Sequence, residues 1–210
     1  MKMNFDSMTA EEVGKLFPIR IEPYNPEWQM LFEKEKALIK GVLGEETALH
    51  IEHFGSTAVV GLAAKPTIDI LVEVPELSVE LQQDIIRKLE TIGYGNMTNA
   101  QQANQMTFGK GYISSQNCEL AKQSDKQTYH VHIRIKGNAP QDEIYFRDYL
   151  RVNSEARDEY AKLKYALAEK HRFNREAYTQ AKTGFITKIT EQQKLCGKIR
   201  KPKPTLLQTE

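Results

Sequence analysis

The sequence predicts an α/β fold: a small mixed sheet with helices packed on it, followed by a helical C-terminal extension. Short apolar runs that read as strands, such as Thr67 to Val74 and Tyr129 to Ile135, alternate with segments of helical periodicity. After Pro140 the character changes, and almost every residue from Asp142 to Leu195 fits a helix. We therefore divide the chain into an N-terminal extension (1–18), an α/β core (19–139), a helical extension (140–196) and a flexible basic tail (197–210).

The first fifty residues contain two helix starts and one short strand. Thr9 to Glu12 reads as a capping box, which predicts a helix over Ala10 to Leu16. Ile19 to Glu22 alternates in polarity and is expected to be an edge strand. Asn25-Pro26-Glu27 begins a long helix, with an N-cap followed by proline at the first position. Its apolar residues recur with a period near 3.6: Trp28, Leu31, Phe32, Leu38, Ile39 and Val42.

The middle of the chain contains the strands. Leu49 to Phe54 and Thr67 to Val74 are predicted to form a pair around a Gly-Ser segment, and Ser78 caps a further helix. Gly93 to Gln105 is expected to be a loop, and Met106 to Ile113 a strand weakened by two glycines. The apolar residues of the helix after Ser78, expected to face the sheet, are Val79, Ile85, Ile86, Leu89 and Ile92.

The end of the chain combines the clearest strand with three helices. In Tyr129 to Ile135, apolar residues occupy one face, and His130, His132 and Arg134 occupy the other. The helical part is expected to break near Asn153-Ser154 and again near Phe173-Asn174.

The composition indicates a soluble cytoplasmic protein. The net charge is +1, with 29 basic and 28 acidic residues among 210, so no general nucleic-acid-binding surface is expected. No apolar run approaches the ~20 residues that span a bilayer, and the N-terminus does not read as a signal peptide. Cys118 and Cys196 lack metal-site spacing and are expected to be free thiols in a reducing compartment.

The stretch from His53 to Val74 contains the strongest functional pattern. Gly55 has no Cβ, so its backbone can approach a ligand closely, and Ser56 follows with a hydroxyl and a backbone N–H that suit a phosphate. Asp69 is a charge inside an apolar strand and needs a partner, for which a metal ion beside a phosphate is the usual choice. Together these residues predict a phosphate site with a cation.

The same stretch resembles a known family. Its Gly-Ser … Asp pattern is similar to the signature of the nucleotidyltransferase superfamily, and the wording GSTAVxGLAAKPxIDILV closely resembles the GrpB family. HVHIRI with FRDYLR, within residues 130 to 151, and REAYTQAKTGFI, residues 175 to 186, resemble it as well. The resemblance runs from about Ile19 to about Ile189.

This resemblance implies a nucleotidyltransferase-like twisted sheet, with the site between the sheet and the helical extension. Gly55 and Ser56 would hold the phosphates of a nucleotide or another phosphorylated small molecule, and Lys65 would neutralise them. Asp69 would bind a divalent cation, Mg²⁺ or Mn²⁺. Active superfamily members usually have Asp-x-Asp on this strand, whereas this chain has Thr67 at the first position, which puts the two-metal arrangement in doubt.

The polar face of the Tyr129 to Ile135 strand is a second functional pattern. Alternate residues on a strand are ~7 Å apart and can converge on one ligand. If this strand lies beside that of Asp69, His130 and His132 would complete a two-histidine, one-carboxylate set suited to a transition metal. Alternatively, both histidines and Arg134 would donate to an anion, or one histidine would act as general base. A solvated strand face without a ligand is the plain alternative.

Basic residues in the helical part are candidates for closing over the phosphates. Tyr178 and Lys182 are four residues apart and therefore share a helix face. By the resemblance, Lys182 would bind phosphate, and Tyr178 would stack on a base or offer its hydroxyl. Weaker candidates of the same kind are Arg147, Tyr160 and Lys164. For all of these residues the plain alternative is a solvated helix face with charged side chains. His53 alternates with Leu49 and Ile51, so it either points inward as a core histidine satisfied by a hydrogen bond or serves as a ligand.

Three functions remain open from the sequence. The first is nucleotidyl transfer from a nucleoside triphosphate to a small acceptor. The second is a nucleotide- or phosphometabolite-binding module without catalysis, which Thr67 favours. The third is a metal-dependent hydrolase that uses Asp69, His130 and His132.

Overall fold

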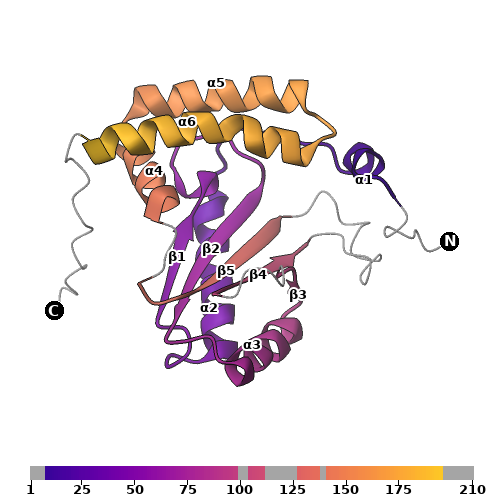
Figure 1. The fold of residues 1–210 in the computed structure, drawn as a ribbon, viewed down its shortest axis with the longest axis vertical. Coiled ribbons are helices and arrows are strands. Elements are labelled where there is room, and N and C mark those ends of the chain that lie inside the picture. Colours follow the sequence, from indigo (N-terminus) through magenta and orange to yellow (C-terminus); the bar gives the residue numbers. More distant parts are fainter. Residues whose placement is uncertain (1–7, 99–103, 112–126, 138–140, 196–210) are drawn as a thin grey trace.

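The computed structural model describes residues 8–98, 104–111, 127–137 and 141–195 (Figure 1). Its centre is a five-stranded mixed sheet in the order β1-β2-β5-β4-β3. The strands are β1 (His50–Phe54), β2 (Thr67–Val74), β3 (Gly95–Asn96), β4 (Gln105–Lys110) and β5 (Thr128–Ile135). β2 and β5 pair in parallel, and the other neighbours pair antiparallel. The predicted α/β fold with a mixed sheet is therefore confirmed.

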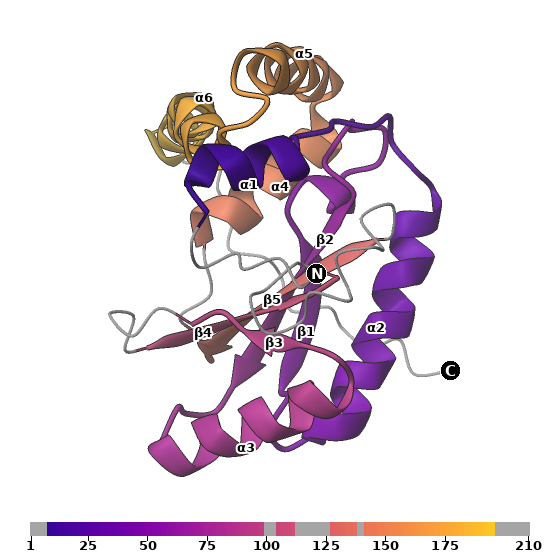
Figure 2. The same cartoon turned by 90° about the vertical axis from the view of Figure 1, so that its right-hand side faces the viewer.

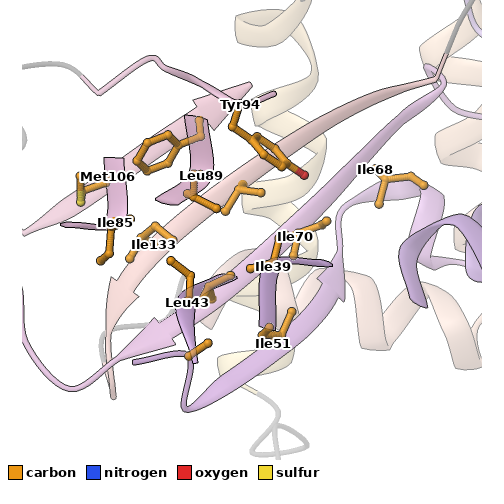
Figure 3. Close-up of a cluster of buried hydrophobic side chains, with 14 of the residues drawn as sticks. Ile39, Leu43, Ile51, Ile68, Ile70, Ile85, Leu89, Tyr94, Met106 and Ile133 are labelled. Carbon is orange, nitrogen blue, oxygen red and sulfur yellow. The ribbon is translucent and has the colours of Figure 1, made fainter. Parts of the chain in front are cut away.

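Two helices cover one face of this sheet, which we call the core face. α2 (Glu27–Leu43) and α3 (Val79–Thr91) pack there against alternate residues of the strands. Figure 3 shows Ile39 and Leu43 of α2 and Ile85 and Leu89 of α3 beside Ile70 of β2 and Ile133 of β5. All six side chains are at most 2% exposed. The apolar alternation of β2 and β5 thus determines which side of the sheet is buried under α2 and α3.

The helical extension consists of α4 (Gln141–Val152), α5 (Ser154–Lys170) and α6 (Arg175–Leu195). In Figures 1 and 2, α5 and α6 lie side by side across one end of the sheet, with α4 between them and the strands. The break predicted at Asn153-Ser154 is present, because the Asn153 side chain accepts the N–H of Ala156 and caps α5. Asn174 accepts the N–H of Ala177 at the start of α6 in the same way.

The N-terminal part also follows its capping signals. Thr9 and Glu12 form the predicted capping box of α1 (Ala10–Leu16). At the start of α2, Asn25 Oδ1 accepts the N–H of Glu27 at 2.9 Å, as expected for an Asn-Pro helix start. α1 lies near the connection between α5 and α6 in Figure 1, and the N–H of Ile19 donates to the Arg172 carbonyl at 2.8 Å.

Several predicted elements differ in detail. The segment Ile19 to Glu22 forms only an isolated bridge between Glu22 and Ala64, because it has no neighbouring strand to extend along. Val79 is 64% exposed, since it is the first residue of α3 and points away from the sheet. The predicted loop after Gly93 contains the short strand β3. β4 ends at Lys110, before Gly111 with φ +77°. Cys118, Cys196 and the basic tail lie outside the described residues.

The face of the sheet opposite to α2 and α3, which we call the site face, is partly polar. It carries the odd-numbered residues of β2 and the even-numbered residues of β5, including Asp69, His130 and His132. Leu71, Phe54 and Ile144 of α4 form a small apolar cluster on the same side. Among the described helices, none has the length and apolar character to cross a membrane.

Candidate phosphate and metal site

The site face brings Asp69, His130 and His132 together. Parallel pairing of β2 with β5 sets Asp69 directly beside His130, 61 positions later in the chain. Asp69 Oδ1 lies 3.5 Å from His130 Nδ1 and 4.0 Å from His132 Nε2, and these two nitrogens are 3.0 Å apart. The three side chains are 19–27% exposed, so a ligand can reach them. They are the one group of potential metal ligands found among the described residues.

Gly55 lies directly against the Asp69 carboxylate. A Cβ at this position would be 2.3 Å from Asp69 Oδ2, and the backbone has φ +72°, a conformation that favours glycine. Ser56 then begins a short 3₁₀ helix, Ser56–Ala58. The Gly-Ser pair predicted for phosphate binding is therefore adjacent to the acid of β2.

Thr67 stands at the first position of the expected Asp-x-Asp pattern, so β2 has one acid there, Asp69, in place of two. Its hydroxyl is 2.8 Å from that of Thr128, its partner in the β2–β5 register, and Thr128 also donates to the Pro66 carbonyl. The position expected to carry the first Asp is thus occupied by a hydroxyl pair that brings no negative charge to a cation.

Three lysines form a cluster from three separate segments. Lys65 precedes β2, Lys164 belongs to α5 and Lys182 belongs to α6. Lys164 is 2% exposed and donates to the Ala63 carbonyl, whereas Lys65 and Lys182 are half-buried. Within the described residues, none of the three forms an ion pair with an acid. We refer to Lys65, Lys164 and Lys182 as the lysine cluster.

Two tyrosines hold these amines. Tyr178 is 1% exposed, and its ring centroid lies 5.7 Å from Lys65 Nζ and 5.4 Å from Lys182 Nζ. Lys164 Nζ lies 4.8 Å from the ring centroid of Tyr160. Such contacts stabilise an ammonium group by the negative face of the ring. Because the Tyr178 ring is buried beneath two amines, it is placed to position lysines and not to stack on a base.

Burial and mutual repulsion act on the lysine cluster. Burial, with the charges of Lys182 and Arg175, lowers the pKa of Lys65 to about 8 although Asp69 opposes the shift. Burial, with Lys182 and Lys65, lowers the pKa of Lys164 to about 7. Burial also lowers the pKa of Lys182, and Asp69 again opposes it. The cluster is therefore poor in compensating negative charge, which an anionic ligand would supply.

The positive and polar neighbours of Asp69 favour its charged form. Burial raises its pKa, but the hydrogen bond from His130 and the charges of His132, His130 and Lys65 outweigh burial and hold the pKa below the ordinary value. Burial and the charge of His130 lower the pKa of His132 to about 3, so its imidazole is neutral near pH 7. A carboxylate beside a neutral imidazole is a set of donors for a cation.

Helix α4 fixes the Gly-Ser segment from the side. Arg147, 4% exposed, donates to the His53 carbonyl at 2.8 Å and pairs with Glu52 at 2.8 Å. Arg151 donates to the Ala58 carbonyl at 3.0 and 3.1 Å. The weak sequence candidate Arg147 thus holds β1 to α4 and is not free to bind phosphate.

Arg134 lies on the site face at the far side of His132. It follows His132 by two residues, and its charge acts on the His132 imidazole. It pairs in register with Glu73, four residues beyond Asp69, which is ~13 Å along a strand. By register, Asp69 is therefore beside His130 and not beside Arg134.

His53 lies on the opposite face of the sheet. It points to the core face, its ring stacks on that of Phe32 with centroids 4.7 Å apart, and it contacts Thr57 Oγ1 at 3.0 Å. This geometry fits a core histidine and not a ligand of the site.

A cavity that does not include the candidate site residues lies beside α1. It has a volume of about 510 Å³ and is formed by α1 and the turn between α5 and α6. Its lining consists of Glu11, Glu169, Lys170, His171, Arg172, Phe173 and Asn174, none of them a candidate of the site.

Lys164 and Tyr160 were only weak candidates from the sequence, but the structure places both beside the segment that joins β1 to β2. Tyr160 shares a hydrogen bond with Ser56, and burial raises its pKa. The signal was present, because Tyr-x-x-x-Lys occurs once in α5 and again in α6, at Tyr160/Lys164 and Tyr178/Lys182. A repeated pair at helical spacing places each amine over the ring of the preceding turn.

The chain is similar to proteins of one family. The family described as GrpB protein matches residues 18–192. The glutamate-rich protein GrpB of Alkalihalophilus pseudofirmus is 34% identical over 166 residues, which cover 79% of this chain and 90% of that protein. The crystal structure of the conserved protein GrpB from Enterococcus faecalis aligns with a TM-score of 0.68 and 34% identity, over 82% of this chain and 96% of that one.

A more distant likeness is to the Cid1 poly(U) polymerase with MgGTP bound, at a TM-score of 0.44 and 15% identity over 76% of this chain. A score this low carries no argument about activity. The family match covers most of the chain, and the relative from A. pseudofirmus is covered over nearly its whole length. This chain is a member of the GrpB family.

Proposed function

We propose that this protein binds a nucleoside triphosphate with a divalent cation and transfers the nucleotidyl group to a small acceptor. The observation that carries the proposal is the lysine cluster: Lys65, Lys164 and Lys182 lack an acidic ion-pair partner within the described residues. The charges of Lys65 and Lys182 are coupled to that of Asp69, and Lys164 is coupled to these two lysines. Buried amines without a counter-ion are costly, and a polyphosphate would compensate them.

Each part of the site has a role in this reaction. Lys65 and Lys182 would neutralise the phosphate oxygens, and Gly55 would allow the chain to approach them beside Asp69. A divalent cation held by Asp69 would supply further positive charge at the phosphates. His130 and His132 lie next to this carboxylate and are the candidates, by position, for metal ligands or for the base.

The proposed reaction balances as a simple displacement. The acceptor oxygen or nitrogen attacks the α-phosphorus, a new bond to phosphorus forms, and the bond to the leaving pyrophosphate breaks. The proton of the acceptor passes to a histidine of the site or to solvent water, and the charge that develops on pyrophosphate is neutralised beside the lysine cluster.

A second function is favoured by one observation. Thr67 occupies the position of the first acid, and its hydroxyl is already bonded to Thr128. A protein with one carboxylate in place of two could bind a nucleotide without transferring it. A metal-dependent hydrolase that uses Asp69 and the two histidines is the third outcome that the same experiment distinguishes.

The test combines α-labelled nucleoside triphosphates, Mg²⁺ or Mn²⁺ and a mixture of small hydroxyl, phosphate and amine acceptors. Pyrophosphate release with labelled adduct, abolished in Asp69→Asn, supports transfer. Saturable binding without turnover supports the binding module, and cleavage without an adduct supports the hydrolase. Glu73→Gln is the matched control. It removes an acid from the same face of β2, but the Glu73 carboxylate accepts the Gly137 N–H and does not belong to the proposed site. Absence of both binding and turnover overturns the proposal.

A further inference from the structure

We propose that Asp69, His130 and His132 bind one first-row transition-metal dication of the Zn²⁺, Fe²⁺ and Co²⁺ class, in preference to Mg²⁺. This deepens the proposed function at the same site and rests on it only for the place of the cation. The metal site itself needs no nucleotide.

The spacing of the three ligand atoms carries the proposal. Asp69 Oδ1, His130 Nδ1 and His132 Nε2 form a triangle with sides of 3.0, 3.5 and 4.0 Å. A point equidistant from these atoms lies about 2.1 Å from each, which is the usual bond length from Zn²⁺ to an imidazole nitrogen or a carboxylate oxygen. Ca²⁺ takes about six to eight oxygen ligands, so a set with two imidazole nitrogens does not suit it.

The chemistry of the donors excludes Mg²⁺ as the preferred ion. Mg²⁺ takes oxygen ligands and keeps several waters, whereas two of the three donors here are imidazole nitrogens. A two-histidine, one-carboxylate set with open positions is the arrangement used for transition-metal dications. Thr67 supplies no second carboxylate that would change this balance, because its hydroxyl is bonded to Thr128.

The surroundings hold the three ligands in place. Gly55 lies against Asp69 Oδ2, which directs the other oxygen, Oδ1, toward the two histidines. The Phe54 ring meets His132 edge-on, with centroids 5.0 Å apart at 80°. On β4, Gly109 pairs with His130 and presents no side chain beside it. Ligands that are already positioned lose little freedom on binding a metal.

Metal binding by both histidines limits which groups can act as the base in the proposed reaction. A histidine nitrogen that binds a metal cannot also accept the proton of the acceptor, so neither His130 nor His132 is then the general base. Lys65 and Lys182 are close enough to Asp69 for their charges to act on each other, so a phosphate held by these two lysines would lie near the metal.

The first test measures metal binding to the whole, chelator-treated protein without nucleotide. Titration calorimetry and the visible absorption of Co²⁺ should report one equivalent of Co²⁺, displaced by Zn²⁺, with Mg²⁺ bound about 100-fold more weakly or worse. Mg²⁺ binding as tight as that of Co²⁺, or no binding of either ion, overturns the proposal. X-ray absorption of the Co²⁺-loaded wild-type protein should show two imidazole ligands, and a shell with none overturns it without any variant.

The second test uses variants with a matched control. His130→Ala and His132→Ala should each weaken Co²⁺ binding by about 100-fold or more, since loss of even an outer-shell partner costs 10–100-fold. His50→Ala removes an exposed histidine outside the site and should bind Co²⁺ like the wild type. Unchanged affinity in both site variants overturns the proposal, with thermal melting used to show that each variant folds.

Lys65→Met separates this proposal from the proposed function. It should lose nucleotide affinity and keep Co²⁺ affinity, since Lys65 is not a ligand. A protein that binds Co²⁺ through both histidines but no nucleotide supports the metal site and rejects the proposed function.

Discussion

The two faces of the sheet bury charge in different ways. On the core face, Glu35 of α2 is 4% exposed, and its carboxylate meets Lys110 Nζ at 2.8 Å. At the end of the sheet covered by α5 and α6, Lys164 is 2% exposed; among the described residues it contacts a carbonyl and an aromatic ring but no acid. A buried charge with its partner is part of the fold, whereas a buried amine without one costs stability that a ligand would restore. The difference supports the proposal that the lysine cluster binds an anion.

We expect the greatest loss of stability when the buried ion pair of the core face, Glu35–Lys110, is broken. Lys110→Met leaves the Glu35 carboxylate buried without its partner, and we expect a loss of about 3 kcal/mol in the free energy of unfolding. Urea denaturation measures it. Lys88→Met is the control, because the Lys88–Asp84 pair at 2.7 Å lies on the exposed side of α3 and should contribute less than about 1 kcal/mol. Equal losses in both variants would show that burial of the Glu35 pair does not matter.

The next effect concerns acid stability. Burial lowers the pKa of His53 to about 4, while an unfolded chain has its histidine pKa near 6.5. Between these values the unfolded state binds more protons, so the stability present above pH 6.5 is lost as pH falls toward 4. We expect His53 to contribute about 2 kcal/mol to this loss.

Chemical denaturation at pH 7 and pH 4.5 tests the contribution of His53. His53→Gln should flatten the pH dependence, and His171→Gln, at the α5–α6 turn, should leave it as in the wild type. His132, whose pKa is also lowered, contributes in the same direction and accounts for part of the remaining slope. The same steep loss in His53→Gln would contradict the prediction.

A smaller effect compares two glycines with positive φ. Gly55 has φ +72°, and its added Cβ would collide with the Asp69 carboxylate, whereas Gly44 has φ +84° and nothing within 4 Å of its added Cβ. Gly44→Ala should cost about 1 kcal/mol from backbone strain alone, and Gly55→Ala about 2 kcal/mol. Thermal unfolding measures both, and Gly55→Ala should in addition displace Asp69 and abolish Co²⁺ binding. Full Co²⁺ affinity in Gly55→Ala would mean that Asp69 is not held by this contact.

Local patterns in the sequence were enough for much of this architecture. Alternation in Tyr129 to Ile135 separated the core residues from His130 and His132, since side chains of a strand point alternately to two faces. Capping residues located the starts of α1, α3 and α5. These signals depend on neighbours a few residues apart and so survive in the linear sequence.

Contacts between distant segments were harder to derive. The register that sets Asp69 beside His130 and Arg134 beside Glu73 is a property of the folded sheet, so alternation alone did not show which residue of this face lies beside Asp69. The burial of Tyr178 beneath two lysines depends on how α6 lies on the segment before β2. The family resemblance supplied Lys65 and Lys182 as candidates and Lys164 as a weaker one, but the burial of Lys164 and its contact with the Ala63 carbonyl are visible only in the fold.

The last prediction concerns the stability of a variant that lacks the buried amine of Lys164. Lys164→Met removes a buried amine that has no acidic partner in the described part of the chain, and it should raise the free energy of unfolding of the ligand-free protein by about 1 kcal/mol at pH 7. Because the folded pKa of Lys164 is about 7 and the ordinary value is ~10.4, the unfolded state binds more protons between these pH values. Stability of the wild type should therefore rise with pH across that range, and Lys164→Met should rise less.

Phosphate binding should move in the opposite direction. Raising the pH through 7 and 8 removes the charges of Lys164 and Lys65, so affinity for inorganic triphosphate should fall while the free protein becomes more stable. Parallel measurements of unfolding and triphosphate binding at pH 6.5 and 8.5 test both trends, with Lys170→Met, on the exposed end of α5, as the control. If Lys164→Met instead destabilises the free protein and leaves triphosphate affinity unchanged, its amine is a structural donor to Ala63, and the contrast between the two faces loses its functional meaning.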